Sequence, residues 1–175
     1  MPVYFEGFPR IVERDSLKPG RWFVAAEGSR PLICFSTDEG GEADDRLVLT
    51  FGTTRPETLD FAATPLKALT GPLATLEHEV VFAPGLAGHS PQLTAPVRRP
   101  FRPGTLLRMR NGDLGLGFAG AAGGLIAVSL ATGFRTEGYD LVFDRWTLSL
   151  RRAGGELLGA RSGRSRGQPK PRRSG

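Results

Sequence analysis

The chain has 175 residues, a formal net charge of +5 and 39% hydrophobic residues, which is enough for one domain or two very small ones. No apolar run approaches the roughly 20 residues of a membrane span, and residues 1–15 lack the basic start and apolar stretch of a secretory signal. Cys34 is the only cysteine, which excludes an internal disulfide and a site with several cysteine ligands. We therefore expect a cytoplasmic protein that is not associated with a membrane.

The first half of the chain predicts β-strands separated by turn residues. Apolar and β-branched runs predict strands over 10–14, 21–27, 31–36, 46–52 and 58–62. Lys18-Pro19-Gly20 predicts the turn before the second of these, since Pro fixes φ and Gly accepts a positive φ. Helical patterns are weak, and the best is a single turn around 65–70. A proline-rich crossing over 62–101 follows, with 76–82 as its most obvious strand.

The second half repeats this β pattern. Strands are predicted over 105–110, 113–118, 125–131, 139–143 and 144–151. Asn111-Gly112 predicts a hairpin with a type I′ turn, because that turn needs a positive φ at both central residues. In the final strand, Trp146 and Leu148 alternate with Thr147 and Ser149, as in a strand with one buried face.

The two halves align with each other in four places, which predicts an internal duplication. Lys18-Pro19-Gly20 matches Arg102-Pro103-Gly104, residues 32–35 match 115–118, and residues 47–49 match 126–128. Each half then closes with an Arg-x-Glu-x-x-Asp pattern. We expect repeat one over about 18–61, the crossing over 62–101, repeat two over about 102–143 and a final strand over 144–151. The fold predicted is all-β, with paired small barrels of SH3-like size or one fused pseudo-two-fold barrel or sandwich.

The stretch from Gly115 to Gly124 contains G-x-G-x-x-G, the spacing of a dinucleotide-binding loop. Such a loop needs a strand that runs directly into the first Gly and a helix that begins inside the motif. Here Asn111-Gly112 interrupts the chain just before Gly115, and β-like residues follow the motif. We therefore predict a hairpin with small residues where backbones approach closely, and no cofactor.

Three other stretches offer weak candidate sites. Gly88-His89-Ser90-Pro91-Gln92 resembles a nucleophile elbow, but Pro91 lacks the N–H that the residue after the serine donates. Glu77-His78-Glu79 places its histidine and its acids on opposite faces of a strand, so no metal site is predicted. Residues 38–45 carry five acids without calcium-loop spacing, and we interpret them as a solvated hairpin tip that is also a candidate docking surface for basic residues.

The duplicated Arg-x-Glu-x-x-Asp pattern is the most specific polar feature of the sequence. Two interpretations remain open: structural closure of each unit, with Arg and Glu paired on one strand face, or a polar site used twice. The residues are Arg55, Glu57, Asp60, Arg135, Glu137 and Asp140.

The excess positive charge lies at one end of the chain. Residues 159–175 contain no acid and are built from Gly, Ser, Pro and basic residues, so they bury too little surface to offset the entropy of ordering. We expect a body over 1–158 and a disordered basic tail over 159–175. The candidate contacts for a polyanion are Arg161, Arg164, Arg166, Lys170, Arg172 and Arg173.

These observations favour a non-enzymatic protein-interaction or assembly module, such as an adaptor or a subunit of a larger complex. The alternative is an accessory nucleic-acid-binding protein that acts through the basic tail, and a third is an enzyme that uses the Arg, Glu and Asp clusters. A protein partner is expected, nucleic acid is a second class of partner through the tail, and the oligomeric state is left open.

Overall fold

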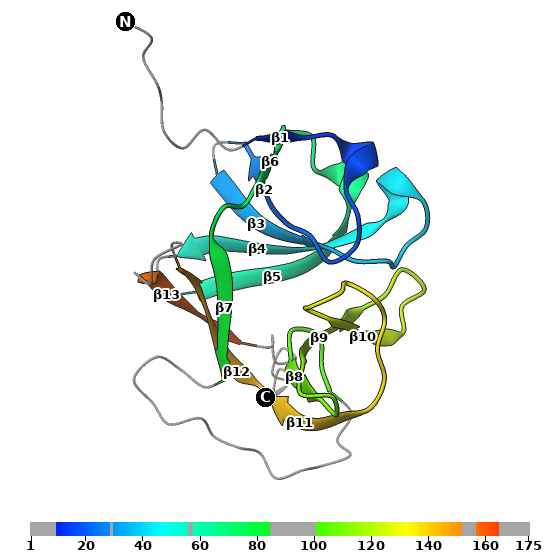
Figure 1. The fold of residues 1–175 in the computed structure, drawn as a ribbon, viewed down its shortest axis with the longest axis vertical. Coiled ribbons are helices and arrows are strands. Elements are labelled where there is room, and N and C mark those ends of the chain that lie inside the picture. Colours follow the sequence, from blue (N-terminus) through cyan, green and yellow to red (C-terminus); the bar gives the residue numbers. More distant parts are fainter. Residues whose placement is uncertain (1–9, 29, 56–57, 85–100, 152–156, 165–175) are drawn as a thin grey trace, which may run out of the picture.

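The computed structural model describes residues 10–28, 30–55, 58–84, 101–151 and 157–164, and these residues form an all-β protein (Figure 1). Three short 3₁₀ helices accompany the strands: η1 (Arg14–Ser16), η2 (Ala43–Asp45) and η3 (Leu66–Ala68). The strands of the first half are β1 (Ile11–Val12), β2 (Trp22–Glu27), β3 (Arg30–Ser36), β4 (Leu47–Arg55), β5 (Thr58–Pro65), β6 (Leu73–Thr75) and β7 (Glu79–Pro84). Those of the second half are β8 (Leu106–Met109), β9 (Leu114–Ala119), β10 (Leu125–Ser129), β11 (Tyr139–Phe143), β12 (Arg145–Arg151) and β13 (Leu157–Arg164).

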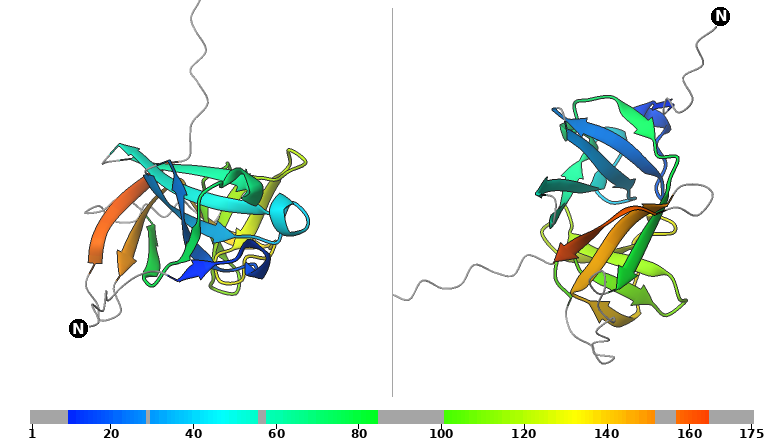
Figure 2. Two further views of the ribbon diagram at one scale, coloured as in Figure 1. Left: turned by 90° about the horizontal axis from the view of Figure 1, so that it is seen from above. Right: turned by 90° about the vertical axis from the view of Figure 1, so that its left-hand side faces the viewer.

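The strands form two sheets. The larger has nine strands in the order β1-β6-β2-β3-β4-β5-β13-β12-β7, and the smaller has four in the order β10-β9-β8-β11. Paired strands run antiparallel, except that β13 lies parallel to β5. The last two strands therefore return to the larger sheet after the smaller one has been built. The right-hand view of Figure 2 shows β13, β12 and β7 side by side, with β7 at the margin.

Each strand predicted from the sequence has a counterpart, but two strands were not predicted. β6 is only three residues long. β13 lacks an apolar run, and it is ordered by pairing with β12 along most of its length and with β5 at Gly163. Residues 159–164 therefore belong to the sheet, where the sequence predicted the start of a disordered tail; residues 165–175 lie outside the described residues. In the crossing, the predicted strand 76–82 is observed as β7, shifted towards its carboxyl end.

Asn111-Gly112 lies in a hairpin as predicted, although the loop differs from the expected one. Met109 N donates to Asp113 O at 2.8 Å, and Gly112 N donates to Met109 O at 2.9 Å. The loop between β8 and β9 therefore has three residues, with Gly112 at a φ of 90°. This is the three-residue hairpin in which a Gly in the left-handed region follows a turn, and the predicted two-residue type I′ turn is wrong.

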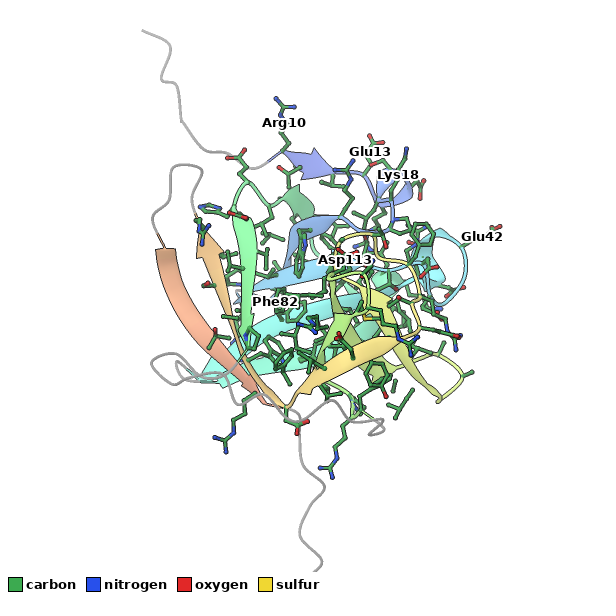
Figure 3. All side chains as sticks on the ribbon, turned by 60° about the horizontal axis from the view of Figure 1, so that its bottom comes forward. Arg10, Glu13, Lys18, Glu42, Phe82 and Asp113 are labelled. Atoms are coloured by element: carbon green, nitrogen blue, oxygen red, sulfur yellow. The ribbon has the colours of Figure 1, made fainter. Side chains whose placement is uncertain are left out.

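The central core lies between the two sheets, and the larger sheet curves around it. The Trp22 ring on β2 lies 5.8 Å from the Phe82 ring on β7, and Phe82 lies 5.3 Å from Trp146 on β12. β2 and β7 are six positions apart in the sheet order, so the sheet bends round until its distant strands meet. Figure 3 shows Phe82 on the side of β7 that faces the interior of the molecule. Twelve buried side chains form this core: Phe35, Leu47, Leu49, Phe51, Leu106, Leu116, Phe118, Ile126, Val128, Phe143, Trp146 and Leu148.

Each sheet also buries its other face in a smaller core of its own. Phe23, Cys34 and Val48 belong to a cluster that η3 and the residues after it cover, whereas Leu107 and Ala127 belong to a cluster on the smaller sheet. The guanidinium of Arg14 helps to hold the η3 turn, since it donates to Leu66 O at 2.9 Å and to Leu69 O.

The two predicted repeats share their first three strands and differ in the fourth. β2-β3-β4 and β8-β9-β10 are both antiparallel meanders. The fourth strand of repeat one, β5, pairs with β4, whereas β11 pairs with β8. Within the described residues, strand pairing closes neither sheet into a barrel. The predicted pair of small barrels is therefore not formed by the strand pairing of these residues.

Candidate interaction surface

The polar pattern of repeat one is spread over two paired strands. Arg55 is the last residue of β4, and Asp60 lies in β5 with its Cα opposite that of Gly52. Glu57 lies outside the described residues. Arg55 and Asp60 therefore lie on neighbouring strands of a hairpin.

In the predicted repeat two, Arg135 and Asp140 have separate partners. Arg135 donates its backbone N–H to Asp38 Oδ1 at 3.0 Å, and its guanidinium lies 3.9 Å from Glu39 Oε1. Asp140 accepts two hydrogen bonds from Arg108, at 3.0 and 2.6 Å. Glu137 is exposed. The predicted pairing of Arg135 with Glu137 is replaced by a pairing with the acidic loop of repeat one, and the pattern does not gather into a polar site here.

Arg108 and Asp140 shift each other's pKa values. The hydrogen bond from Arg108 holds the pKa of the Asp140 carboxyl below its ordinary value, and the same bond raises the pKa of Arg108. Both side chains are substantially exposed, with 48% and 37% of their surface accessible. We therefore interpret the pair as a contact between the neighbouring strands β8 and β11 and not as a reactive group.

The acidic stretch 38–45 contacts residues of the body. Asp38 and Glu39 hold Arg135, and Asp45 Oδ1 lies 2.6 Å from Lys67 Nζ. These contacts tie the β3–β4 connection to the β10–β11 connection and to η3. Asp44 and Glu42 are exposed at the tip, as expected for a solvated loop.

The glycine-rich stretch forms the β9–β10 hairpin, as predicted. Gly120 N donates to Gly124 O, and Gly123 N donates to Gly120 O. A Cβ on Gly117 would lie 2.4 Å from the Phe101 ring, so the strand glycine makes room for that side chain. The dinucleotide spacing is therefore a hairpin in which a small residue allows close packing.

The remaining candidates do not gather into a site. His78 lies at a bend before β7, and residues 85–100, which contain His89 and Ser90, lie outside the described residues. In the described part of the chain, no group of three or more His, Cys, Asp or Glu could hold a metal ion. No described helix is long and apolar enough to cross a membrane. Of the basic tail residues, Arg161 and Arg164 lie in β13, and Arg166, Lys170, Arg172 and Arg173 lie beyond the described residues.

The strongest candidate surface is the outer edge of β7. β7 pairs with β12 in six consecutive residue pairs without a bulge. Ser149 Oγ on β12 donates to Val81 O at 3.5 Å, so the Val81 carbonyl faces β12. Because backbone groups alternate sides along a strand, the N–H and C=O of Val80 and Phe82 face away from β12. No described strand pairs with them there.

The side chains of β7 suit a strand that is only partly covered. Val80, Val81 and Phe82 are half-buried, whereas Ser149 and Leu148, the β12 residues opposite Val81 and Phe82, are buried. Val80 and Phe82 belong to the margin of the central core, as does Trp22. A strand laid along this edge would therefore bury more of an aromatic cluster that is already formed.

Other strands at the sheet edges are protected in ways that β7 is not. β1 has two residues. The outer edge of β10 is bonded by residues 134–136, since Ser129 N donates to Phe134 O and Thr136 N donates to Ala127 O. β11 is interrupted by a bulge between Tyr139 and Leu141. The charged residue and the proline of β7, Glu79 and Pro84, lie at its two ends. Val80–Ala83 therefore form an apolar run without a charge, proline or bulge that would hinder the pairing of another strand.

The sequence predicted the β7 strand but not its exposed edge. The edge results from the sheet order, in which β12 returns from the far end of the chain to cover one side of β7. The alternation of Glu79, Val81 and Ala83 with Val80 and Phe82 is the local pattern of a half-covered strand, and it does not reveal which neighbour is missing.

Comparison with known proteins found none that is similar to this chain. No protein-family model matches the chain, and no curated protein and no solved structure matches it either.

Proposed function

We propose that the protein is a non-enzymatic interaction or assembly module, an adaptor or a subunit of a larger complex, and that it binds an extended segment of a partner protein along β7. The observation that carries this proposal is the regular outer edge of β7, where no described strand pairs with the backbone groups of Val80 and Phe82. In this mode of recognition, main-chain hydrogen bonds supply affinity and alternate side chains supply selectivity.

The chemistry of the edge defines the partner segment. Its residues on the inner face lie beside Val80 and Phe82 and therefore are apolar, because Trp22 and Phe82 form the wall that they contact. Its backbone is extended and free of proline at the positions that face Val80 and Phe82, since these positions supply the donors of the new ladder.

Selection of extended peptides tests this proposal. Peptides displayed on phage are selected on the immobilised full-length chain, and their affinities for variants are measured by fluorescence anisotropy. Ala83→Lys places a charge on the β7 edge, and the control Ala119→Lys places one on an exposed alanine of β9, which is paired on both sides. We expect Ala83→Lys to weaken binding by about tenfold or more, which is about 1.4 kcal/mol, and Ala119→Lys to leave it unchanged.

Hydrogen exchange of the complex gives a second measurement. Bound peptide should protect the amides of Val80 and Phe82, whose N–H groups face the edge, more than it protects the amide of Val81. Equal binding to both lysine variants, or protection confined to other strands, would overturn the docking site. The same holds if no extended peptide is selected.

We also propose that the two meanders arose by duplication and have since diverged. In support, Gly20 N donates to Ser36 O and Gly104 N donates to Gly117 O, so both Pro-Gly turns bond the second strand alike. The Cα pairs Trp22–Phe35 and Leu106–Leu116 are equivalent, as are Phe35–Leu49 and Leu116–Val128. This register shifts the second strand by two residues from the alignment made on sequence. A crystal structure with a different register in either meander would contradict the duplication.

The alternative function is nucleic-acid binding through the basic tail. The inclusion of Arg161 and Arg164 in β13 bears on it, because four basic residues then follow the last described strand. Anisotropy with a random DNA duplex over a salt series tests it: four phosphate contacts give a slope of log K against log salt of roughly −4, and six give roughly −5. Replacement of Arg166, Lys170, Arg172 and Arg173 by Gln should abolish such binding. No binding near physiological salt would exclude this function.

A further inference from the structure

β7 itself meets each requirement that its outer edge places on a partner strand. The partner needs an extended backbone, apolar residues beside Val80 and Phe82, and no proline opposite them. β7 supplies such a segment as Val80–Ala83, which its pairing with β12 already holds extended. We propose that the partner segment is β7 of a second copy of this chain, and that the two copies form a symmetric dimer. This inference rests on the proposed function, because it names the occupant of the same edge.

The backbone groups at the edge restrict how two β7 strands can pair. The N–H and C=O of Val80 and Phe82 face away from β12, so these residues belong in the hydrogen-bonded pairs of an antiparallel ladder. When Val80 lies opposite Phe82 of the second copy, and Phe82 opposite Val80, all of these groups are used, because each such pair exchanges two hydrogen bonds. Val81 then lies opposite Val81 of the second copy, at the two-fold axis.

Shifting this ladder by two residues in either direction loses hydrogen bonds. In one shift Val80 lies opposite Pro84, which has no N–H to donate to the Val80 carbonyl. In the other shift Phe82 lies opposite His78, which lies in a bend before β7. The two ends of the strand therefore select the register that is centred on Val81.

The side chains are compatible with this register on both faces of the sheet, since directly opposed residues share a face. On the inner face, Phe82 lies beside Val80 of the second copy, so each copy covers the half-buried margin of the other's central core. On the outer face, the exposed Glu79 lies opposite the exposed Ala83. The two Glu79 residues are then four positions apart along the ladder, about 14 Å, so the acids of the two copies do not oppose each other.

The small size of the contact predicts a dimer that depends on concentration. β7 has six residues, and we expect their pairing to bury less than the roughly 1,200 Å² of a stable specific interface. The strand is already formed in each copy, however, so pairing orders little additional backbone. We therefore expect a dissociation constant on the order of 100 μM.

Analytical ultracentrifugation of the full-length chain, from about 1 μM to about 1 mM, tests the dimer. Residue 83 lies opposite Glu79 twice in each dimer. Ala83→Glu therefore opposes like charges and should give a dissociation constant about tenfold higher than Ala83→Lys, which opposes unlike charges. Ala119→Glu changes an exposed alanine of β9 and should leave the dissociation constant unchanged. A protein that is monomeric throughout this range, or equal effects of the two Ala83 substitutions, would overturn the proposed dimer.

Cysteine crosslinking between two copies tests the position of the two-fold axis. Val81→Cys should form a disulfide under mild oxidation, because opposed residues in a pair without hydrogen bonds have Cα atoms about 4.5 Å apart. Ala83→Cys is the matched control, since it is more exposed on the same face of β7 but lies about 14 Å from its copy. Cys34 is buried, so it does not compete. Equal yields from the two variants overturn the register.

Competition with a selected peptide separates this inference from the proposed function. Saturating peptide should convert the dimer to monomer, because both occupy the same edge, and a dimer that it leaves intact does not form through β7. A chain that stays monomeric but binds selected peptides along β7 overturns the dimer and leaves the docking site in place. A dimer that crosslinks through Val81→Cys, in a protein that selects no edge-dependent peptide, upholds the second copy and overturns the docking of another protein.

Discussion

Gly20 and Gly133 touch at the junction between the two sheets. A Cβ atom on Gly133 would lie 2.1 Å from the backbone nitrogen of Gly20 and 2.6 Å from Ser36 O. Both glycines have a positive φ, of 78° and 76°. Nearby, Asp38 N donates to Gly133 O at 3.0 Å. The turn before β2 and the connection after β10 thus meet backbone to backbone, without room for a side chain.

This contact predicts a large effect of Gly133→Ala. The substitution adds both the strain of a positive φ and a clash with backbone atoms that cannot rotate away. Gly123→Ala is the matched control, because Gly123 has a φ of 79° and a Cβ added there would meet nothing within 4 Å. We expect the control to lose about 1 to 2 kcal/mol of unfolding free energy and Gly133→Ala to lose more than about 3 kcal/mol. Urea denaturation measures both, and equal losses would contradict the contact.

Gly117 predicts a coupling with Phe101. A Cβ on Gly117 would lie 2.4 Å from the Phe101 ring, so Gly117→Ala should destabilise the protein by about 1 to 3 kcal/mol. In a Phe101→Ala background the same change should cost much less, because the clash is gone. Gly124→Ala, which meets nothing within 4 Å, is the control. Additive losses in the double variant would show that the ring does not lie on Gly117.

The Arg108–Asp140 pair predicts an effect of acid. The pKa of Asp140 is lowered by Arg108, so the pair favours the folded state above the ordinary carboxyl pKa of 3.8. This contribution is lost as the pH falls below 3.8 through the lower folded value. Titration of the Asp140 carboxyl by NMR should show the low pKa, and Arg108→Gln should return it towards the ordinary value. An Asp140 pKa that is the same in both proteins would contradict the pairing.

Cys34 predicts an effect of alkali and a slow thiol reaction. Burial raises its pKa to about 12, from an ordinary value of 9.0. The folded state therefore favours the protonated thiol, and this contribution is complete below pH 9.0 and is lost as the pH rises towards about 12. A thiol reagent at pH 8 should react with the native protein far more slowly than with the protein in urea, because the thiolate is the nucleophile. Equal rates would mean that Cys34 is accessible in the folded state.

Local patterns were sufficient to predict most strands, because apolar runs bounded by Pro-Gly and Asn-Gly define them without reference to distant residues. They could not predict β13, whose Gly, Ser and Arg residues form a strand through the neighbours β12 and β5. β5 and β11, which the sequence alignment treats as equivalent strands, pair with different partners, since pairing is decided by the whole sheet.

The polar pattern illustrates the same limit at the level of a site. The spacing of Arg135, Glu137 and Asp140 suggested a local cluster, yet Arg135 contacts Asp38 and Glu39, and Asp140 contacts Arg108. Asp38 lies 97 residues from Arg135 and Arg108 lies 32 residues from Asp140 along the chain, so no local pattern contains these partners. The edge of β7 was equally hidden, because an unpaired edge is a property of the sheet order.

The late return of β12 and β13 to the larger sheet sets an order of events during synthesis. β5 and β7 leave the ribosome long before β12 and β13, which lie between them in the finished sheet. Until those residues arrive, the nascent chain displays the edges of both strands and an incomplete aromatic core around Phe51 and Phe82. Such long-range pairing folds slowly and is exposed to aggregation. A ribosome that stalls before residue 145 would therefore release a chain in need of a chaperone.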